Sequence, residues 1–334
     1  MTYGMAVLIA VLTGLAAAGG TAFMLRVLAR RRILDHPNER SSHERATPRG
    51  AGIAVIGALL AAWVAVAALA PAARPTVAWI VPGALLLAVV SWRDDLKSLP
   101  ALPRFVAQLV AVAAGLAVFG DDGLIFQGLL PLWADRLVAA IAWLWFVNLF
   151  NFMDGIDGLA GTETVAIGLG VALLALLVGG SPALVALALA AAGAALGFLP
   201  WNWHPARIFL GDVGSVPLGY VLGWLLLSAA VAGQWAAALI LPLYYLADAT
   251  LTLLRRLLRG ERVWRAHREH FYQRAVQGGR SHGEVVALVA AADAVLVALA
   301  LGASRWPWPM LAAAIVAVGL LLAVLARPKA LPAR

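Results

Sequence analysis

Long apolar stretches alternate with short polar connections along almost the whole chain. Eleven of these stretches reach or come within one residue of the roughly 17–25 residues that an α-helix needs to cross a bilayer. We expect membrane spans at about 4–25, 51–70, 77–92, 103–119, 134–151, 159–178, 182–199, 214–231, 235–254, 284–301 and 306–326. The pattern therefore predicts an all-α polytopic integral membrane protein.

The composition narrows the class of protein further. Hydrophobic residues make up 63% of the 334 residues and charged residues only 13%, about half the charged share of a soluble domain. These proportions exclude a soluble enzyme, a collagen and a disordered chain. The chain has no cysteine, which excludes disulfides, thiol catalysis and zinc–thiolate sites.

Basic residues gather in alternate connections between the predicted spans. With eleven spans, 22 of the 25 Lys and Arg residues fall on one side, which by the positive-inside rule is the cytoplasm. The N-terminus is then outside and the C-terminus cytoplasmic, with cytoplasmic loops at about 26–50, 93–103, 152–158, 200–213 and 255–283. The net charge of +8 is explained by an anionic lipid leaflet and calls for no nucleic acid. We expect one transmembrane domain, 1–334, that works at its cytoplasmic face.

Five aspartates stand in these cytoplasmic loops. Asp94 and Asp95 follow the third predicted span, Asp154 and Asp157 follow the fifth, and Asp212 precedes the eighth. Acids at a membrane boundary are costly unless they face a polar cavity or a cation. Oxygen ligands without cysteine suit Mg²⁺ acting on phosphates. If the three helix ends converge, the acids form a magnesium site.

Each of these motifs also has a simpler interpretation. An Asp-Asp pair in a loop is usually solvated surface. Asn148 and Asn151 fit helix-to-helix hydrogen bonds, and Asp212 fits the positive end of a helix dipole. The occurrence of all three motifs on one side of the membrane favours a functional site over these alternatives.

Other polar residues on the same side offer partners for phosphates. His267, Arg268 and His270 place several hydrogen-bond donors close together, although a basic loop attracted to lipid explains most of this segment. Arg49 either holds a phosphate at a helix mouth or anchors the positive-inside loop. Asp248 lies inside the ninth predicted span, where it is a functional candidate, a partner for an arginine, or an anchor for the basic loop.

Two runs make a family resemblance specific. Asn148-Leu149-Phe150-Asn151-Phe152-Met153-Asp154-Gly155-Ile156-Asp157-Gly158-Leu159 and Phe209-Leu210-Gly211-Asp212-Val213-Gly214-Ser215 occur in order and on the predicted cytoplasmic side. With them, nearly the whole chain resembles the polyprenyl-phosphate N-acetylhexosamine-1-phosphate transferases of glycosyltransferase family 4. That superfamily includes the phospho-MurNAc-pentapeptide transferase of peptidoglycan synthesis.

The resemblance implies transfer of a sugar-1-phosphate from a UDP-sugar to a polyprenyl phosphate, with release of UMP. It implies Mg²⁺ as cofactor, with Mn²⁺ as a substitute. Asp212 matches the magnesium ligand, with Asp154 as a less certain second ligand. Asp94 and Asp95 match an Asp pair whose first member is proposed to deprotonate the lipid phosphate. The residues expected to bind the nucleotide or the donor are Asn148, Asn151, Asp154, Asp157, Phe209, His267, Arg268, His270 and Arg49.

One departure narrows the expected substrate. The peptidoglycan enzyme has three consecutive histidines, whereas this chain has His267-Arg268-Glu269-His270. That form resembles the branch that starts O-antigen or other surface polysaccharides, including lipopolysaccharide. We expect transfer of GlcNAc-1-phosphate, or that of a deoxy relative, to undecaprenyl phosphate in the inner plasma membrane. Phospho-MurNAc-pentapeptide transfer, an ion-coupled transporter, a non-catalytic scaffold and a homodimer stay open.

Overall fold

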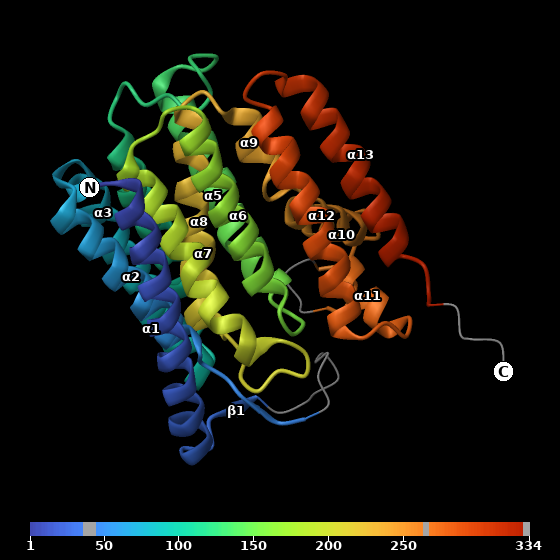
Figure 1. Ribbon diagram of the computed structural model, residues 1–334. Coiled ribbons are helices and arrows are strands. Elements are labelled where there is room, and N and C mark those ends of the chain that lie inside the picture. Colours follow the sequence, from blue (N-terminus) through green and yellow to red (C-terminus); the bar gives the residue numbers. More distant parts are fainter. Residues whose placement is uncertain (36–44, 263–266, 330–334) are drawn as a thin grey trace.

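The computed structural model describes residues 1–35, 45–262 and 267–329, and long α-helices account for most of them (Figure 1). Ten of these helices are long and apolar enough to cross a membrane. They are α1 (Tyr3–Arg30), α2 (Gly52–Leu69), α3 (Arg74–Lys97), α4 (Ala101–Leu116), α5 (Leu132–Met153), α6 (Leu159–Leu177), α7 (Pro182–Asn202), α8 (Asp212–Val231), α12 (His282–Gly302) and α13 (Pro307–Leu325). Two 3₁₀ turns, η1 (Pro71–Ala73) and η2 (Ala117–Phe119), extend α3 and α4. The predicted all-α membrane architecture is confirmed.

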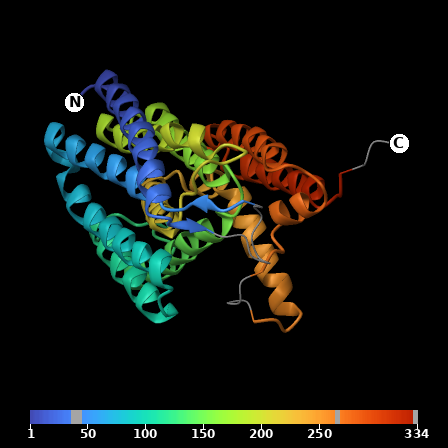
Figure 2. The same cartoon turned by 90° about the horizontal axis from the view of Figure 1, so that it is seen from below.

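The stretch expected as a single span at 235–254 is broken. It forms α9 (Trp235–Ile240) and α10 (Leu243–Leu258), which meet at Pro242. A proline inside a helix lacks an N–H group and its ring clashes with the preceding turn, so the helix breaks there. Figure 2 shows α10 pointing outward from the rest of the bundle. The prediction of eleven uninterrupted spans is therefore wrong at this position.

Helix α8 is at the centre of the bundle. Nearly all its residues are buried, and α2, α3, α5 and α6 pack against it. The Trp143 ring of α5 stacks on Tyr220 of α8 with centroids 4.8 Å apart. The Trp143 indole N–H also donates to the Tyr220 carbonyl at 2.9 Å. These contacts fix the position of the helix whose first residue is Asp212.

Small residues bring α1 and α7 into backbone contact. A Cβ atom added to Gly197 of α7 would lie 2.0 Å from the carbonyl oxygen of Gly14 in α1. One added to Gly193 would lie 2.3 Å from the Ala10 carbonyl oxygen. Close approach of this kind is how helices associate in lipid, so both positions require glycine.

Most candidate site residues lie at one end of the bundle. At this end α3, α5 and α7 finish while α2, α6, α8 and α12 begin (Figure 1). The short helix α11 (Phe271–Gln277) lies there, as does an antiparallel pair formed by β1 (Leu34–Asp35) and β2 (Thr47–Pro48). Residues 36–44 of the predicted first cytoplasmic loop lie outside the described residues.

Candidate active site

An arginine lies between two carboxylates at the end of the bundle. The Arg49 guanidinium Nη2 is 2.8 Å from Asp95 Oδ1, at the end of α3, and 2.6 Å from Asp212 Oδ1, at the start of α8. Burial opposes the charged form of Arg49, but Asp212 and Asp95 outweigh it and raise the pKa of Arg49 above its ordinary value. Asp95 and Asp212 are thus brought together around one cation.

Asp95 also caps the central helix. Its carboxylate accepts the backbone N–H groups of Asp212 at 3.2 Å and Val213 at 3.0 Å. The N-terminal N–H groups of a helix have no partner within the helix, and Gly211 before α8 supplies no capping side chain. Gly211 has φ +77, and a Cβ there would lie 3.0 Å from Asp95 Oδ2. The contact between Asp95 of α3 and the start of α8 therefore requires glycine at position 211.

The segment that carries Arg49 is fixed by its backbone. The Phe209 N–H donates to the Pro48 carbonyl at 2.8 Å, and the Gly50 N–H donates to the Phe209 carbonyl at 3.0 Å. A Cβ on Gly52 would lie 2.3 Å from the Gly214 nitrogen. Phe209, expected to stack on the nucleotide, is half-buried. Its backbone positions Arg49, a role that its side-chain type did not suggest.

Asp94 lies in a different group of contacts from its neighbour. Its carboxylate is 2.7 Å from Arg104 Nη1 and accepts the Leu99 N–H at 2.6 Å. Consecutive residues of a helix point about 100° apart, so Asp94 and Asp95 face different partners. The structure does not pair Asp94 with the Asp95–Arg49–Asp212 group. Arg104 was not among the residues singled out from the sequence.

The polar residues near the end of α5 have two different roles. Asn148 exchanges hydrogen bonds with Gln108 of α4, at 2.8 Å and 3.4 Å, a contact that ties two helices together. Asn151 Oδ1 accepts the hydroxyl of Ser215 in α8 at 2.6 Å. Asp154 follows at the end of α5, where burial is the main cause that raises its pKa well above the ordinary value. Arg49 opposes this shift and nearby carboxylates add to it.

Asp157 binds two histidines that sequence reasoning missed. Its Oδ2 is 2.7 Å from His204 Nδ1 and 3.2 Å from His282 Nδ1, and it accepts the Ala206 N–H at 3.1 Å. Burial raises the pKa of Asp157, but hydrogen bonds from His282 and His204 outweigh it and hold the pKa below its ordinary value. The sequence held a signal, since His204 lies five residues before Phe209 and His282 lies two residues before the predicted span 284–301.

Asp248 organises the start of α11. This buried carboxylate lies 3.2 Å from His270 Nδ1 and accepts the N–H groups of Phe271 at 2.9 Å and Tyr272 at 3.2 Å. The Tyr272 hydroxyl in turn donates to the Phe152 carbonyl at 3.0 Å. Of the three interpretations of Asp248, these contacts favour the one in which it anchors the basic loop, here at His270.

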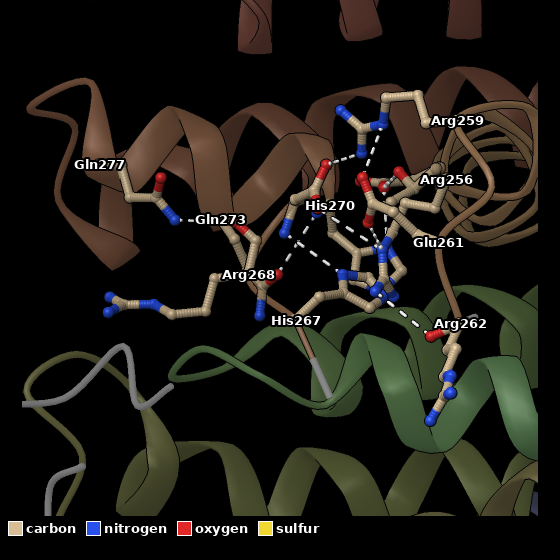
Figure 3. A network of polar contacts seen from close by, with 12 residues as sticks. Arg256, Arg259, Glu261, Arg262, His267, Arg268, His270, Gln273 and Gln277 are labelled. Carbon is tan, nitrogen blue, oxygen red and sulfur yellow. Dashed lines mark hydrogen bonds and ion pairs between the residues drawn. The ribbon is translucent and has the colours of Figure 1, made fainter. Parts of the chain in front are cut away.

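His267 lies near His270 in a group of arginines and glutamates (Figure 3). The His267 and His270 rings lie 4.8 Å apart. Burial is the main cause that lowers the pKa of His267 to about 4, and His270 and Arg256 add to it. Glu261 and Glu269 form ion pairs with Arg256 and Arg259, whereas the Arg268 side chain extends away from the histidines (Figure 3). At neutral pH, His267 is therefore an uncharged hydrogen-bonding group.

The residues present fit a magnesium ion. Asp95 and Asp212 direct carboxylate oxygens at the point where the Arg49 charge lies, and Mg²⁺ prefers oxygen ligands of this kind. Asp154 interacts electrostatically with both carboxylates. The donor set of these carboxylates is thus suited to a divalent cation.

One family profile and several known proteins match this chain. Residues 77–230 match the profile of glycosyl transferase family 4. A probable undecaprenyl-phosphate N-acetylglucosaminyl 1-phosphate transferase from Bacillus subtilis is 30% identical over 274 residues, 78% of this chain and 75% of the relative. A decaprenyl-phosphate N-acetylglucosaminephosphotransferase from Mycolicibacterium smegmatis is 30% identical over 319 residues, 83% of this chain and 78% of the relative. A phospho-N-acetylmuramoyl-pentapeptide-transferase from Moorella thermoacetica is 45% identical over 93 residues, 28% of this chain and 29% of the relative.

Proposed function

Since this chain belongs to glycosyl transferase family 4 and is a glycosyl-1-phosphate transferase, we propose that it moves N-acetylglucosamine-1-phosphate, or that of a deoxy relative, from a UDP-sugar to undecaprenyl phosphate. An oxygen of the lipid phosphate forms a bond to the β-phosphorus, the bond between the two donor phosphates breaks, and UMP leaves. The observation that carries this proposal is the Asp95–Arg49–Asp212 group at one end of a membrane bundle. We place this end at the cytoplasmic face of the inner membrane, where surface polysaccharides such as O-antigen begin.

The side chains divide the work of binding phosphates. Asp212 and Asp95 would hold Mg²⁺, with Asp154 beside them, and the ion would neutralise the pyrophosphate charge. Arg49, one-third exposed, is the cation placed to contact a phosphate when it leaves the carboxylates. His267 and His270 offer ring nitrogens for hydrogen bonds to the donor phosphates. His267 is uncharged at neutral pH, because its pKa is lowered to about 4. Positioning and charge neutralisation account for most of the acceleration in reactions of this type.

An apolar cavity is available for part of a lipid chain. Its volume is about 550 Å³, and it lies where α5, α8, α9, α10 and α13 meet. Trp143, Phe146, Trp235 and Leu246 are among its lining residues. Because the lining is almost wholly apolar, the cavity suits a prenyl segment better than a sugar or an ion.

The test is UMP release by the purified protein with undecaprenyl phosphate, Mg²⁺ and a panel of UDP-sugars. We expect release to need both lipid and metal, and Asp212→Asn to reduce it by roughly a thousandfold or more, as removal of a central charge-stabilising group does. Asp121→Asn, an exposed acid in the connection between α4 and α5, is the matched control and keeps wild-type turnover.

Different outcomes would overturn the metal assignment, the sugar donor and the transfer reaction itself. Turnover at the wild-type rate in Asp212→Asn would reject the metal assignment. UDP-MurNAc-pentapeptide as the best donor would move the enzyme to peptidoglycan synthesis. Absence of release with every donor, together with ion-coupled uptake in proteoliposomes, would favour a transporter.

A further inference from the structure

Three side chains of types that bind metals lie close together outside the Asp95–Arg49–Asp212 group. Asp157 lies in the turn between α5 and α6, His204 in the connection between α7 and α8, and His282 at the start of α12. One ligand atom from each lies within 4.8 Å of the other two. Asp157 and His282 are more than nine-tenths buried, whereas His204 is exposed. Segments distant in sequence therefore bring two imidazole nitrogens and a carboxylate oxygen close together.

Two polar atoms of Asp157 lie close to the same nitrogen of His282. His282 Nδ1 lies 3.3 Å from the Asp157 backbone nitrogen and 3.2 Å from Asp157 Oδ2. An imidazole nitrogen either donates a proton or accepts one. If Nδ1 accepts the N–H, its lone pair faces the carboxylate oxygen; if Nδ1 carries the proton, the N–H loses its acceptor. A cation between Nδ1 and Oδ2 uses a lone pair of each, so it replaces the repulsion between these two atoms with attraction, although the Asp157 N–H then no longer bonds to Nδ1.

The spacing also suits a small cation. Zinc binds histidine nitrogen at about 2.0–2.1 Å and carboxylate oxygen at about 2.0–2.2 Å in tetrahedral geometry, which places neighbouring ligand atoms roughly 3.3 Å apart. The observed separations from Asp157 Oδ2 are 2.7 Å to His204 Nδ1 and 3.2 Å to His282 Nδ1. Small adjustments of the exposed His204 would complete the geometry.

We propose that Asp157, His204 and His282 form a zinc site. Two imidazoles and one carboxylate are a typical zinc donor set, whereas Mg²⁺ prefers oxygen ligands alone. The fourth position opens on the side of the exposed His204 and takes a water molecule. The site is separate in chemistry and ligands from the magnesium site of the proposed transfer reaction.

The position of the zinc site gives it a structural role. Asp157 lies three residues after Asp154 in the connection between α5 and α6. The next residue, Gly158, donates its N–H to Asn202 Oδ1 at 2.8 Å. The loop from His204 leads to Phe209 and Asp212. Zinc therefore ties together the two connections that carry the proposed donor-binding residues, and fastens both to α12.

The experiment measures zinc in the purified full-length protein, without substrates and after removal of any polyhistidine tag. The protein is equilibrated with micromolar zinc and a competing chelator, then assayed by inductively coupled plasma mass spectrometry. We expect about one zinc per chain in the wild type, and at least roughly tenfold less in His204→Gln and His282→Gln. Zinc should also raise the melting temperature of the wild type and of neither variant.

Two variants serve as controls for the location of the metal. His267→Gln and Asp212→Asn should keep full zinc, since neither residue belongs to the cluster. Zinc that is absent from the wild type, retained by both cluster variants, or lost in His267→Gln overturns the proposal. Size-exclusion chromatography and tryptophan fluorescence establish that each variant is folded. Because zinc content is read without UMP release, failure of the zinc site and failure of the proposed transfer reaction are distinguishable.

Discussion

The Arg49 guanidinium lies at the place where the proposed magnesium ion would bind. It satisfies the carboxylates of Asp95 and Asp212 at 2.8 Å and 2.6 Å. Two carboxylates this close repel each other unless a cation stands between them. Arginine and metal therefore compete for the same oxygens, and metal binding would release the guanidinium toward the donor phosphates.

Replacement of this arginine should change two affinities in opposite directions. In Arg49→Gln, we expect roughly fivefold tighter Mn²⁺ or Mg²⁺ binding, which is the scale of a partly exposed ion pair. The KM for the UDP-sugar should rise, because a phosphate-binding cation is lost. Electron paramagnetic resonance of Mn²⁺ and steady-state kinetics measure the two effects. Equal metal affinity in variant and wild type would show that Arg49 does not compete.

The uncharged state of His267 has a consequence for acid stability. Its pKa is lowered to about 4, while an ordinary histidine titrates near 6.5. Between these values the unfolded chain binds a proton that the folded protein does not, so stability falls as pH decreases from about 6.5 to 4. His267→Gln should flatten the dependence of melting temperature on pH within this window. An identical slope in the variant and the wild type would assign the acid lability to other groups.

At the scale of elements, α10 and α11 act together through Asp248. The carboxylate accepts the first N–H groups of α11 and contacts His270. It also contacts the hydroxyls of Tyr244 and Thr252 on its own helix, each at 3.3 Å. Among the contacts described, Asp248 bonds to the backbone of Phe271 and Tyr272 and to the side chain of His270. It therefore acts by holding His270 in place, which makes it a positioning residue.

Removal of this charge should affect the donor more than the metal. In Asp248→Asn, we expect kcat/KM for the UDP-sugar to fall by about 10- to 100-fold, as happens when an orienting partner is lost. The magnesium dependence should stay unchanged. Asp135→Asn is the matched control: Asp135 is also buried and accepts two backbone N–H groups, from Ile125 and Phe126, but it lies at the other end of α5. An equal kinetic loss in both variants would reduce Asp248 to a stabilising role.

The extent of sequence-based prediction differs between these elements. Apolar length predicted the ten long helices, because lipid leaves little choice but helix for such stretches. The break at Pro242 was readable from the sequence, but proline also occurs at 82, 200 and 217 inside continuous helices. Tertiary packing decides which prolines break a helix. Helix geometry predicts that Asp94 and Asp95 point apart, but which of them faces Arg49 depends on the rotation of α3 against its neighbours, which no spacing reveals.

At the scale of the whole molecule, the contact between α1 and α7 joins the start of the chain to its middle. Gly197 and Gly14 meet there with no room for a side chain. The abundance of small residues predicted close packing, but not which two helices would meet. This pairing requires the folded arrangement of all the helices between them.

A pair of identical substitutions tests that contact. Gly197→Ala should destabilise the protein by about 1–3 kcal/mol, the usual cost of overpacking. Gly19→Ala lies in α1 with nothing within 4 Å of the added Cβ, so it should be neutral or stabilise by up to about 1 kcal/mol through helix propensity. The free energy of unfolding in a detergent titration measures both. Equal effects would mean that the α1–α7 contact opens without cost.

The burial of α8 limits which amino-acid substitutions this protein tolerates during evolution. Its side chains contact neighbours on all sides, and its first residue is Asp212. A small molecule that binds against the first turn of this helix would meet positions at which most substitutions damage packing and activity together. Mutations that confer resistance to such an inhibitor would then concentrate in the connecting loops. The lipid-facing residues of helices such as α1 and α13 would accumulate most of the neutral variation.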